Sequence, residues 1–506
     1  MSAAATARPT AAGLIELVLD PGSFVGWDEP ILPFGSAAYR AELEAARAAT
    51  GLDEAVVTGE GRVGGHRVAV VVGEFRFLGG SIGVAAAARV TAAIARATRE
   101  RLPVLAAPVS GGTRMQEGTV AFVQMATITA AVVEHREAGL PYLVYLRHPT
   151  TGGVFASWGS LGHVTVAEPG ALIGFLGPRV YEALHGEAFP SGVQLAENLY
   201  AHGLVDAALA PGRLRGLAID VLDAWQARAD GAAAGPRPPA ELGEEDDWAT
   251  VARSREAGRP GLRSVLRRAT GRAVPLSGSG RGETDPNLTL AIARFGGRGV
   301  VVLGQDRRSQ LPGRELGPGA LRVAARGFRL AAELRLPLVT VIDTSGAALS
   351  REAEEGGLAG EIARCLAALL TIPVPTVSVI LGQGTGGGAL ALLPADRIIA
   401  AEHAWLSPLP PEGASAIVHR DVDHAPQLAR AQRIGARHLL EDGIVDAIVP
   451  EGEDPAGEVV QAIARALDEV AASDPVARLA RRRHRFAGLT PVFSAPEPSA
   501  IREDCP

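Results

Sequence analysis

The chain carries the same short motifs twice, in the same order and at an almost constant distance along the sequence. Arg101-Leu102-Pro103 returns in the second half of the chain as Arg335-Leu336-Pro337. The four other pairs are Ser110-Gly111 with Ser345-Gly346, Thr151-Gly152-Gly153 with Thr385-Gly386-Gly387, Ala167-Glu168 with Ala401-Glu402, and Gly203-Leu204-Val205-Asp206 with Gly443-Ile444-Val445-Asp446. One match of this length is coincidence, whereas five in one order predict two copies of a single fold, each of about 200 residues.

A change in composition separates the two copies. Residues 231–247 combine alanine, glycine, proline and an acidic run, a mixture that does not favour a packed core. We therefore predict an N-terminal domain at 1–235, a linker at 236–260, a C-terminal domain at 261–470 and a tail at 471–506. We expect this tail to form an arginine-rich helix followed by a terminus that does not pack on the domain.

Within each half, short apolar runs alternate with alanine-rich segments of helical period. Continuous apolar strands separated by helices predict an α/β fold with buried strands. In the first half we expect strands at 68–72, 104–108, 142–146 and 163–167, with helices at 85–100 and 119–137. In the second half we expect strands at 300–303, 339–343, 376–381 and 397–401, with helices at 321–333 and 358–369.

Composition excludes several classes of function. A formal charge of −7 and 4% aromatic residues argue against binding to nucleic acid or to an anionic membrane. The sequence contains no lysine, which excludes a Walker A loop, a Schiff-base lysine and a biotin attached to this chain. Histidines at metal-ligand spacing are absent, so we expect no metal. Two cysteines, Cys365 and Cys505, and no long apolar run or export signal predict a cytoplasmic protein.

Each half places one glycine cluster after its second strand and another after its third. The clusters lie at 110–114 and 150–153 in the first half, and at 344–347 and 382–388 in the second. A tight strand-to-helix turn explains any one of them. Two per half at matching positions favour a further role, because a small-residue turn at a helix N-terminus leaves backbone N–H groups unpaired. Two such turns facing each other would form an oxyanion hole, which stabilises negative charge on oxygen.

A different interpretation of the last cluster is a dinucleotide site. Gly382, Gly384 and Gly387 fit the G-x-G-x-x-G fingerprint that follows a strand. The equivalent turn of the first half lacks the fingerprint, and the acidic residue downstream, Glu402, follows the fourth strand instead of the second. We therefore favour the oxyanion-hole interpretation.

The motifs together resemble the carboxyltransferase component of biotin-dependent acyl-CoA carboxylases. The first half resembles the β subunit of the bacterial acetyl-CoA carboxylase transferase in LDPGSF (19–24), FLGGSIG (77–83), SGGTRMQEG (110–118), PTTGGV (149–154) and AEPGALIGFLGPRV (167–180). The second half resembles the α subunit in ARFGGRGVVVLGQD (293–306), VIDTSGA (341–347), GQGTGGGALAL (382–392) and SPLPPEGASAI (407–417). The resemblance covers most of residues 15–225 and 285–450.

This resemblance implies two tandem crotonase-like domains of the ββα spiral type, fused in one chain. It also implies transfer of a carboxyl group from carboxybiotin to the α-carbon of an acyl-CoA such as acetyl-CoA or propionyl-CoA. Biotin arrives on a separate carrier protein, its ureido anion takes the α-proton, and the enolate captures CO2. With acetyl-CoA the product would be malonyl-CoA, for fatty acid biosynthesis.

The resemblance also assigns site residues. The catalytic residues would be Gly111, Gly112, Gly152 and Gly153 in the first half, and Gly346, Ala347, Gly386 and Gly387 in the second. The substrate-binding residues would be Arg76, Gly79, Gly80, Ser81 and Arg114, with the two arginines meeting phosphates of CoA. No metal is implied.

The sequence departs from the family pattern in three respects. The four-cysteine zinc ribbon that usually opens the β subunit is absent, Ser345 stands where the α-type loop has proline, and Gln383 stands where it has glutamate.

The expected partners are a biotin carboxylase, a biotin carboxyl carrier protein and further copies of this chain, in a dimer or a hexamer. Family members place the active site between the first-type domain of one protomer and the second-type domain of another. The alternatives are a decarboxylase component acting on malonyl thioesters and a catalytically silent scaffold of a carboxylase complex.

Overall fold

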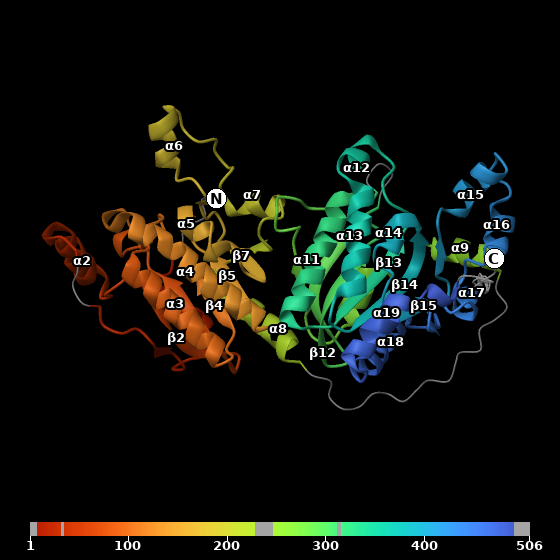
Figure 1. Cartoon of the computed structure of the whole chain (residues 1–506), viewed down its shortest axis with the longest axis horizontal. Coiled ribbons are helices and arrows are strands. Elements are labelled where there is room, and N and C mark those ends of the chain that lie inside the picture. The colour runs from red at the N-terminus through yellow and green to blue at the C-terminus, as the bar shows by residue number, and fades with distance from the viewer. Residues whose placement is uncertain (1–7, 32–34, 228–245, 311–314, 490–506) are drawn as a thin grey trace, which may run out of the picture.

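A computed structural model describes residues 8–31, 35–227, 246–310 and 315–489 of the chain. Figure 1 shows two α/β units side by side, the first coloured red to yellow and the second green to blue. In each unit a twisted sheet is covered by helices that run between its parallel strands. No helix in these described ranges has the length and apolar character needed to span a bilayer.

The first unit is built on a seven-stranded sheet in the order β1-β2-β3-β4-β5-β7-β9. Strands β2 and β3 form an antiparallel hairpin, and from β3 to β9 all neighbours are parallel. The strands of this sheet are β1 (Val25–Gly26), β2 (Val56–Val63), β3 (His66–Gly73), β4 (Val104–Ala107), β5 (Tyr142–Leu146), β7 (Val164–Ala167) and β9 (Ala207–Ala208). The short strands β6 (Thr150–Thr151) and β8 (Ile173–Gly174) pair separately. The helices are α1 (Ala11–Val18), α2 (Ala37–Thr50), α3 (Val84–Arg99), α4 (Gly118–Glu137), α5 (Gly152–Phe155), α6 (Pro178–His185), α7 (Ala196–Ala201) and α8 (Pro211–Gln226).

The second unit follows the same plan, with a main path β10-β11-β12-β13-β14-β15-β17 and β16 paired to β14. Again an antiparallel hairpin, β11 with β12, leads into parallel strands. Its strands are β10 (Val274–Leu276), β11 (Leu288–Phe295), β12 (Arg298–Gln305), β13 (Leu338–Thr344), β14 (Thr376–Thr385), β15 (Arg397–Ala401), β16 (Trp405–Ser407) and β17 (Ala447–Val449). Its helices are α9 (Asp247–Ser254), α10 (Leu262–Arg268), α11 (Pro318–Leu334), α12 (Arg351–Glu355), α13 (Leu358–Thr371), α14 (Gly386–Leu390), α15 (Pro411–Val418), α16 (Ala425–Ala431), α17 (Ala436–Glu441), α18 (Pro455–Ala471) and α19 (Pro475–His484).

The predicted α/β class, the duplication and the eight predicted strands are confirmed. All four helices predicted within the two halves are also present, within a few residues of the expected bounds. The sequence analysis missed the outer hairpin strands β2 and β11. Glycine and charged residues interrupt the apolar pattern of β2, whose sequence is VVTGEGRV, so periodicity did not reveal it.

The repeated motif that ends in aspartate has the same structural task in each half. The Asp206 amide donates to the Thr165 carbonyl oxygen (2.7 Å), and its carboxylate accepts from the Thr165 amide (2.8 Å). In the second half, Asp446 makes the same two contacts with Ile398, both at 2.7 Å. Each aspartate thus fixes the amino end of the fourth parallel strand. This explains why Asp206 and Asp446 recur in the sequence.

The two halves are joined through a shared apolar core and a buried ion pair. Helix α8 of the first half packs on β11 and β12 of the second, within one continuous cluster of buried side chains. The approach at β12 is so close that a Cβ on Gly299 would stand 1.7 Å from the Ala224 carbonyl oxygen. Nearby, Arg326 of α11 pairs with Asp206 at 2.9 Å. The first half is therefore anchored to the sheet of the second.

The predicted linker, 236–260, lies partly outside the described residues. Its described part includes α9, which packs on the second unit, since the indole N–H of Trp405 donates to Ser254 Oγ at 2.8 Å. The predicted tail, 471–506, includes α19, whose Arg482 is buried and pairs with Asp396 at 2.6 Å. Both segments are thus tied to the second unit where the structure describes them, and the domain division itself stays a prediction.

We expect Gly299→Ala to lower the free energy of unfolding by about 1–3 kcal/mol, because the added methyl group has no room at the joint. Gly216→Ala is the matched control, since Gly216 lies on an exposed face of α8 with nothing within 4 Å of a Cβ. That control should keep or raise stability, by up to about 1 kcal/mol. Thermal denaturation followed by circular dichroism measures both. Equal melting temperatures for Gly299→Ala and the unsubstituted chain would contradict this description of the joint.

Candidate functional site

The two glycine turns of the first half lie against each other at the carboxyl ends of β4 and β5. Ser110 bridges to Thr150, and the Thr151 amide donates to the Ser110 carbonyl oxygen at 3.0 Å. Gly112 and Gly152 have φ angles of +124° and +63°, in the region that favours glycine. A Cβ on Gly152 would stand 3.4 Å from the Gly112 Cα atom. The fold therefore brings together two clusters that the sequence keeps well apart, with the whole of α4 and β5 between them.

Hydrogen bonds within these turns occupy most of the predicted catalytic amides. The Gly111 amide donates to the Gly79 carbonyl oxygen (2.9 Å), and the Gly112 amide donates to Ser110 Oγ (3.0 Å). The Gly152 amide donates to the Phe175 carbonyl oxygen (3.0 Å). Two amides differ: within the described ranges, no acceptor binds the N–H of Thr113 or of Gly153. The glycines shape the turns, and these two amides are available to a ligand.

The second half repeats this arrangement at the carboxyl ends of β13 and β14. The Gly346 amide donates to Thr344 Oγ1 at 3.1 Å. In the part of the chain that is described, the amides of Ala347 and Gly387 have no acceptor. A Cβ on Gly388 would stand 3.5 Å from the Ala347 nitrogen, so the two turns are in contact. Thus Ala347 and Gly387 occupy the positions that Thr113 and Gly153 occupy in the first half.

Sequence reasoning missed Thr113. It named Gly111 and Gly112 because they are glycines, whereas their own amides are used inside the turn. The signal that could have found Thr113 was the duplication, since Ala347 was named and is its counterpart at the spacing of the repeated motifs. Applying that spacing to every named residue would have paired Ala347 with Thr113.

Of the two departures from the family pattern in the second half, Ser345 helps to hold a turn, whereas Gln383 contributes only a backbone amide that glutamate would also supply. The Ser345 amide donates to Gln310 Oε1 at 3.1 Å, a bond that a proline could not form. The Gln383 amide donates to Asp343 Oδ1 at 3.2 Å, which ties the ends of β13 and β14 together. Burial raises the pKa of Asp343 to about 6, although the positive charge of Arg307 opposes that rise.

Arg114 does not occupy a position where it could meet a phosphate of CoA. Its side chain is 0% exposed and forms a double ion pair with Glu54, which is 1% exposed. The remaining N–H groups donate to Tyr39 Oη (3.1 Å) and to the Ser81 carbonyl oxygen (2.7 Å), among others. Burial alone would lower the pKa of Arg114, but its contacts with Glu54 raise it above the ordinary value. Arg114 positions the turn that carries Thr113, and its predicted role in binding substrate does not fit this geometry.

The other predicted binding residues form a loop behind the first turn. Gly79 supplies the carbonyl oxygen that holds Gly111 in place. Gly80 has a φ angle of +64°, and a Cβ there would stand 2.2 Å from the Val109 carbonyl oxygen. Ser81 Oγ donates to the Leu78 carbonyl oxygen at 2.8 Å. Arg76 is exposed and keeps guanidinium N–H groups beyond its bond to the Ala49 carbonyl oxygen (2.7 Å), so it remains the candidate for a phosphate contact.

The site is made of backbone groups and not of reactive side chains. No cluster of histidine, cysteine or carboxylate side chains in the described part of the chain has the arrangement of a metal site. Cys365 is buried beneath α11, and burial raises the pKa of its thiol to about 12, so it is not a nucleophile at neutral pH. Each half contains a pair of peptide amides that lack an acceptor among the described residues, and such donors suit negative charge on oxygen.

Comparison with known proteins identifies the family of this chain. A family model for the carboxyl transferase domain matches residues 4–207, and a model for acetyl co-enzyme A carboxylase carboxyltransferase-like proteins matches residues 242–489. The probable biotin-dependent acyl-coenzyme A carboxylase beta3 subunit of Mycobacterium tuberculosis is 60% identical over 466 residues, covering 92% of this chain and 94% of that protein. The acetyl-coenzyme A carboxylase carboxyl transferase subunits beta/alpha of Salinispora arenicola is 39% identical over 521 residues, covering 95% and 91%.

Solved structures agree on the fold. Transcarboxylase 12S, a hexamer solved with methylmalonyl-coenzyme A bound, superposes with a TM-score of 0.74 at 22% identity and covers 92% of this chain and 90% of its own. A single-chain, multi-domain long-chain acyl-CoA carboxylase superposes with a TM-score of 0.68 at 19% identity, covering 89% of this chain and 45% of its own. The fold is therefore that of crotonase-like carboxyltransferases. The chain belongs to the carboxyltransferase family of biotin-dependent acyl-CoA carboxylases, with its β-type and α-type parts fused.

We expect Arg114→Met to lower the free energy of unfolding by about 3–5 kcal/mol, because it leaves the Glu54 carboxylate buried without its cation. The double variant Arg114→Met/Glu54→Leu removes both charges and should recover most of that loss. Thermal denaturation measures the stability, and steady-state kinetics measure the KM for the acyl-CoA. A stable double variant whose KM rises more than tenfold would show that Arg114 contacts the substrate after all.

Proposed function

We propose that the two pairs of open amides are the oxyanion holes of this carboxyltransferase. The amides of Thr113 and Gly153 form one, and those of Ala347 and Gly387 form the other. Each pair would donate to one oxygen that gains negative charge during carboxyl transfer. The observation that carries the proposal is that these four amides have no acceptor within the described residues, while amides beside them in the turns do. Removal of one such donor costs on the order of 3 kcal/mol in the transition state.

Two oxygens need such stabilisation in this reaction. One is the thioester oxygen of the acyl-CoA, which carries the charge of the enolate, and the other is the ureido oxygen of biotin. Carboxybiotin supplies both the carboxyl group and the base for the α-proton. The chain's own residues orient the two oxygens and hold their charge, so no side-chain base is required. Because the chain has no lysine, biotin would reach the site on a separate carrier protein.

The proposed substrate is an acyl-CoA such as acetyl-CoA or propionyl-CoA, and the proposed partners are a biotin carboxylase and a biotin carboxyl carrier protein. The names of the related carboxylase subunits support these assignments. With acetyl-CoA the product is malonyl-CoA, which would place the enzyme in fatty acid biosynthesis. We expect the reaction to take place in the cytoplasm.

We propose further that a second copy of the chain covers the site. Large apolar side chains surround the turns of both halves and remain exposed in the single chain. They include Met115 (83% exposed) and Phe175 (71%) in the first half, and Leu349 (93%) in the second. Apolar surface of this kind favours association. If the first half of one copy meets the second half of another, the two oxyanion holes face each other across the contact, in a dimer or in a hexamer built from dimers.

The amide hypothesis is tested by comparing two substitutions at one position. Gly153→Ala keeps the amide, whereas Gly153→Pro removes it at a place in the first turn of α5 where a helix tolerates proline. We expect kcat for carboxyl transfer from carboxybiotin to acetyl-CoA to be about 10²–10³-fold lower in the proline variant than in the alanine variant. Equal rates in the two folded variants would refute the role of this amide. Release of CO2 from malonyl-CoA without carboxybiotin would instead favour the decarboxylase alternative.

Co-expression of two defective chains tests the shared site. One chain carries Gly153→Pro and the other Gly387→Pro, each with a different affinity tag. If sites form between chains, random pairing leaves about one quarter of them with two intact halves, so about one quarter of full activity returns. If each site forms within one chain, the mixture is no more active than the separate variants. Size-exclusion chromatography of each variant verifies that assembly is unchanged.

A further inference from the structure

A cleft between the two halves, separate from the glycine turns, gathers positive charge. It encloses about 550 Å³ and is lined by five arginines and only two carboxylate residues. Arg136 comes from the end of α4 in the first half. The others belong to the second half: Arg281 precedes β11, and Arg326, Arg329 and Arg335 lie on or just after α11. Because both halves contribute, a ligand in this cleft would contact both.

The carboxylates of the cleft do not balance these charges. Arg136 pairs with Glu333 at 2.6 Å, and Arg326 pairs with Asp206 at 2.9 Å. Burial alone would raise the pKa of Glu333, but its contacts with His163 and Arg136 lower that pKa to about 2, so this carboxylate is ionised at neutral pH. In the part of the chain that the structure describes, the guanidinium groups of Arg281 and Arg329 have neither a hydrogen bond nor an ion pair.

The cations of the cleft also repel one another. Burial lowers the pKa of the Arg329 guanidinium, and the positive charges of Arg281 and Arg136 lower it further. The negative charge of Glu333 raises the pKa of Arg329 and so offsets part of this decrease. Clustered like charges destabilise the folded chain unless an anion neutralises them.

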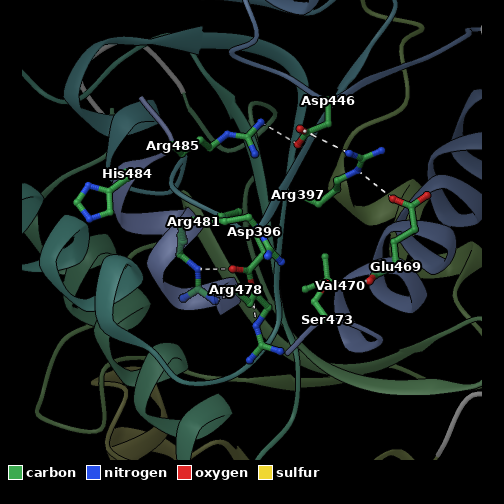
Figure 2. A pocket seen from close by; sticks show the side chains of 12 residues that line it. Asp396, Arg397, Asp446, Glu469, Val470, Ser473, Arg478, Arg481, His484 and Arg485 are labelled. Carbon is green, nitrogen blue, oxygen red and sulfur yellow. Dashed lines mark hydrogen bonds and ion pairs between the residues drawn. The ribbon is translucent and has the colours of Figure 1, made fainter. Parts of the chain in front are cut away.

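In a cleft at the equivalent place in the second half, most arginines are paired with carboxylates of the chain itself. There Asp446 takes the place of Asp206, and arginines on or just after α19 take the place of those on α11 (Figure 2). Arg485 pairs with Asp446 at 2.8 Å, and Arg397 pairs with Glu469 at 3.0 Å. Most cations of that cleft thus have a carboxylate of the chain. The cleft between the halves has no such carboxylates for Arg281 and Arg329.

We propose that the cleft between the halves binds the diphosphate group of a small molecule. Two free guanidinium groups match two phosphate groups, because arginine binds phosphate oxygens in a bidentate manner. The volume is within the usual range for a small-molecule site. Free pyrophosphate, a nucleoside diphosphate and the diphosphate of coenzyme A share this chemistry. The bound group would bridge Arg136 of the first half to Arg281 and Arg329 of the second, and so stabilise the joint between them.

Inorganic pyrophosphate is the first probe. We expect it to raise the melting temperature of the full chain more than sodium chloride of equal ionic strength does, and to bind measurably by titration calorimetry. The double variant Arg281→Gln/Arg329→Gln should bind at least tenfold more weakly. The control, Arg213→Gln/Arg267→Gln, removes two exposed arginines outside the cleft, so net charge is matched and binding should persist.

ADP and coenzyme A are then compared with pyrophosphate. Binding that the cleft variant loses identifies the molecule that carries the diphosphate, and binding of pyrophosphate alone identifies a free diphosphate ligand. No effect of pyrophosphate beyond that of salt would overturn the proposal, as would an equal loss in the control variant. These measurements need no turnover, and Gly153→Pro protein should bind as well as the unsubstituted chain, so failure here is distinct from failure of the proposed function.

Discussion

Peptide amides that lack an acceptor among the described residues, held at the ends of parallel strands, are the feature on which the proposed site depends. A strand that turns at once into a short helix leaves its first N–H groups unpaired. Gly112 and Gly152, with positive φ angles, allow two such turns to approach within van der Waals contact. Neighbouring amides are then bound internally, which fixes the turns, and the Thr113 and Gly153 amides are left open. A backbone donor that is already fixed in place does not have to reorganise when negative charge develops on oxygen.

Side chains remote from the reaction keep these turns in place. In the first half the buried pair of Arg114 and Glu54 clamps the segment that follows Thr113. In the second half Asp343 and Gln310 hold backbone amides of the two turns instead. The duplicated fold has thus kept the arrangement of open amides while the supports behind it diverged. The same divergence is seen at the amino ends of the sheets, where one cleft is closed by α19 and the other lies between the halves.

Much of this architecture could be predicted from the sequence, and the exceptions have physical causes. The apolar strands and alanine-rich helices were visible because burial on a sheet imposes a local pattern. Strand β2 was missed because glycine and charged residues interrupt that pattern. The burial of Arg114 was not foreseen because a sequence does not show that Glu54, far away along the chain, lies beside it in the core. Thr113 was overlooked because the type of a side chain does not show whether the amide of the same residue has an acceptor.

The sequence alone determined that the chain is a duplicated α/β protein, that its glycine turns follow the second and third strands of each half, and that it resembles the carboxyltransferases. These properties depend on residues close together in the chain or on a constant spacing between copies. Tertiary structure decided which amides remain open, which arginines are buried in ion pairs, and which cations meet between the halves. Those outcomes depend on hydrogen-bond partners and charges far apart in sequence, and only the packing of strands and helices brings them within reach.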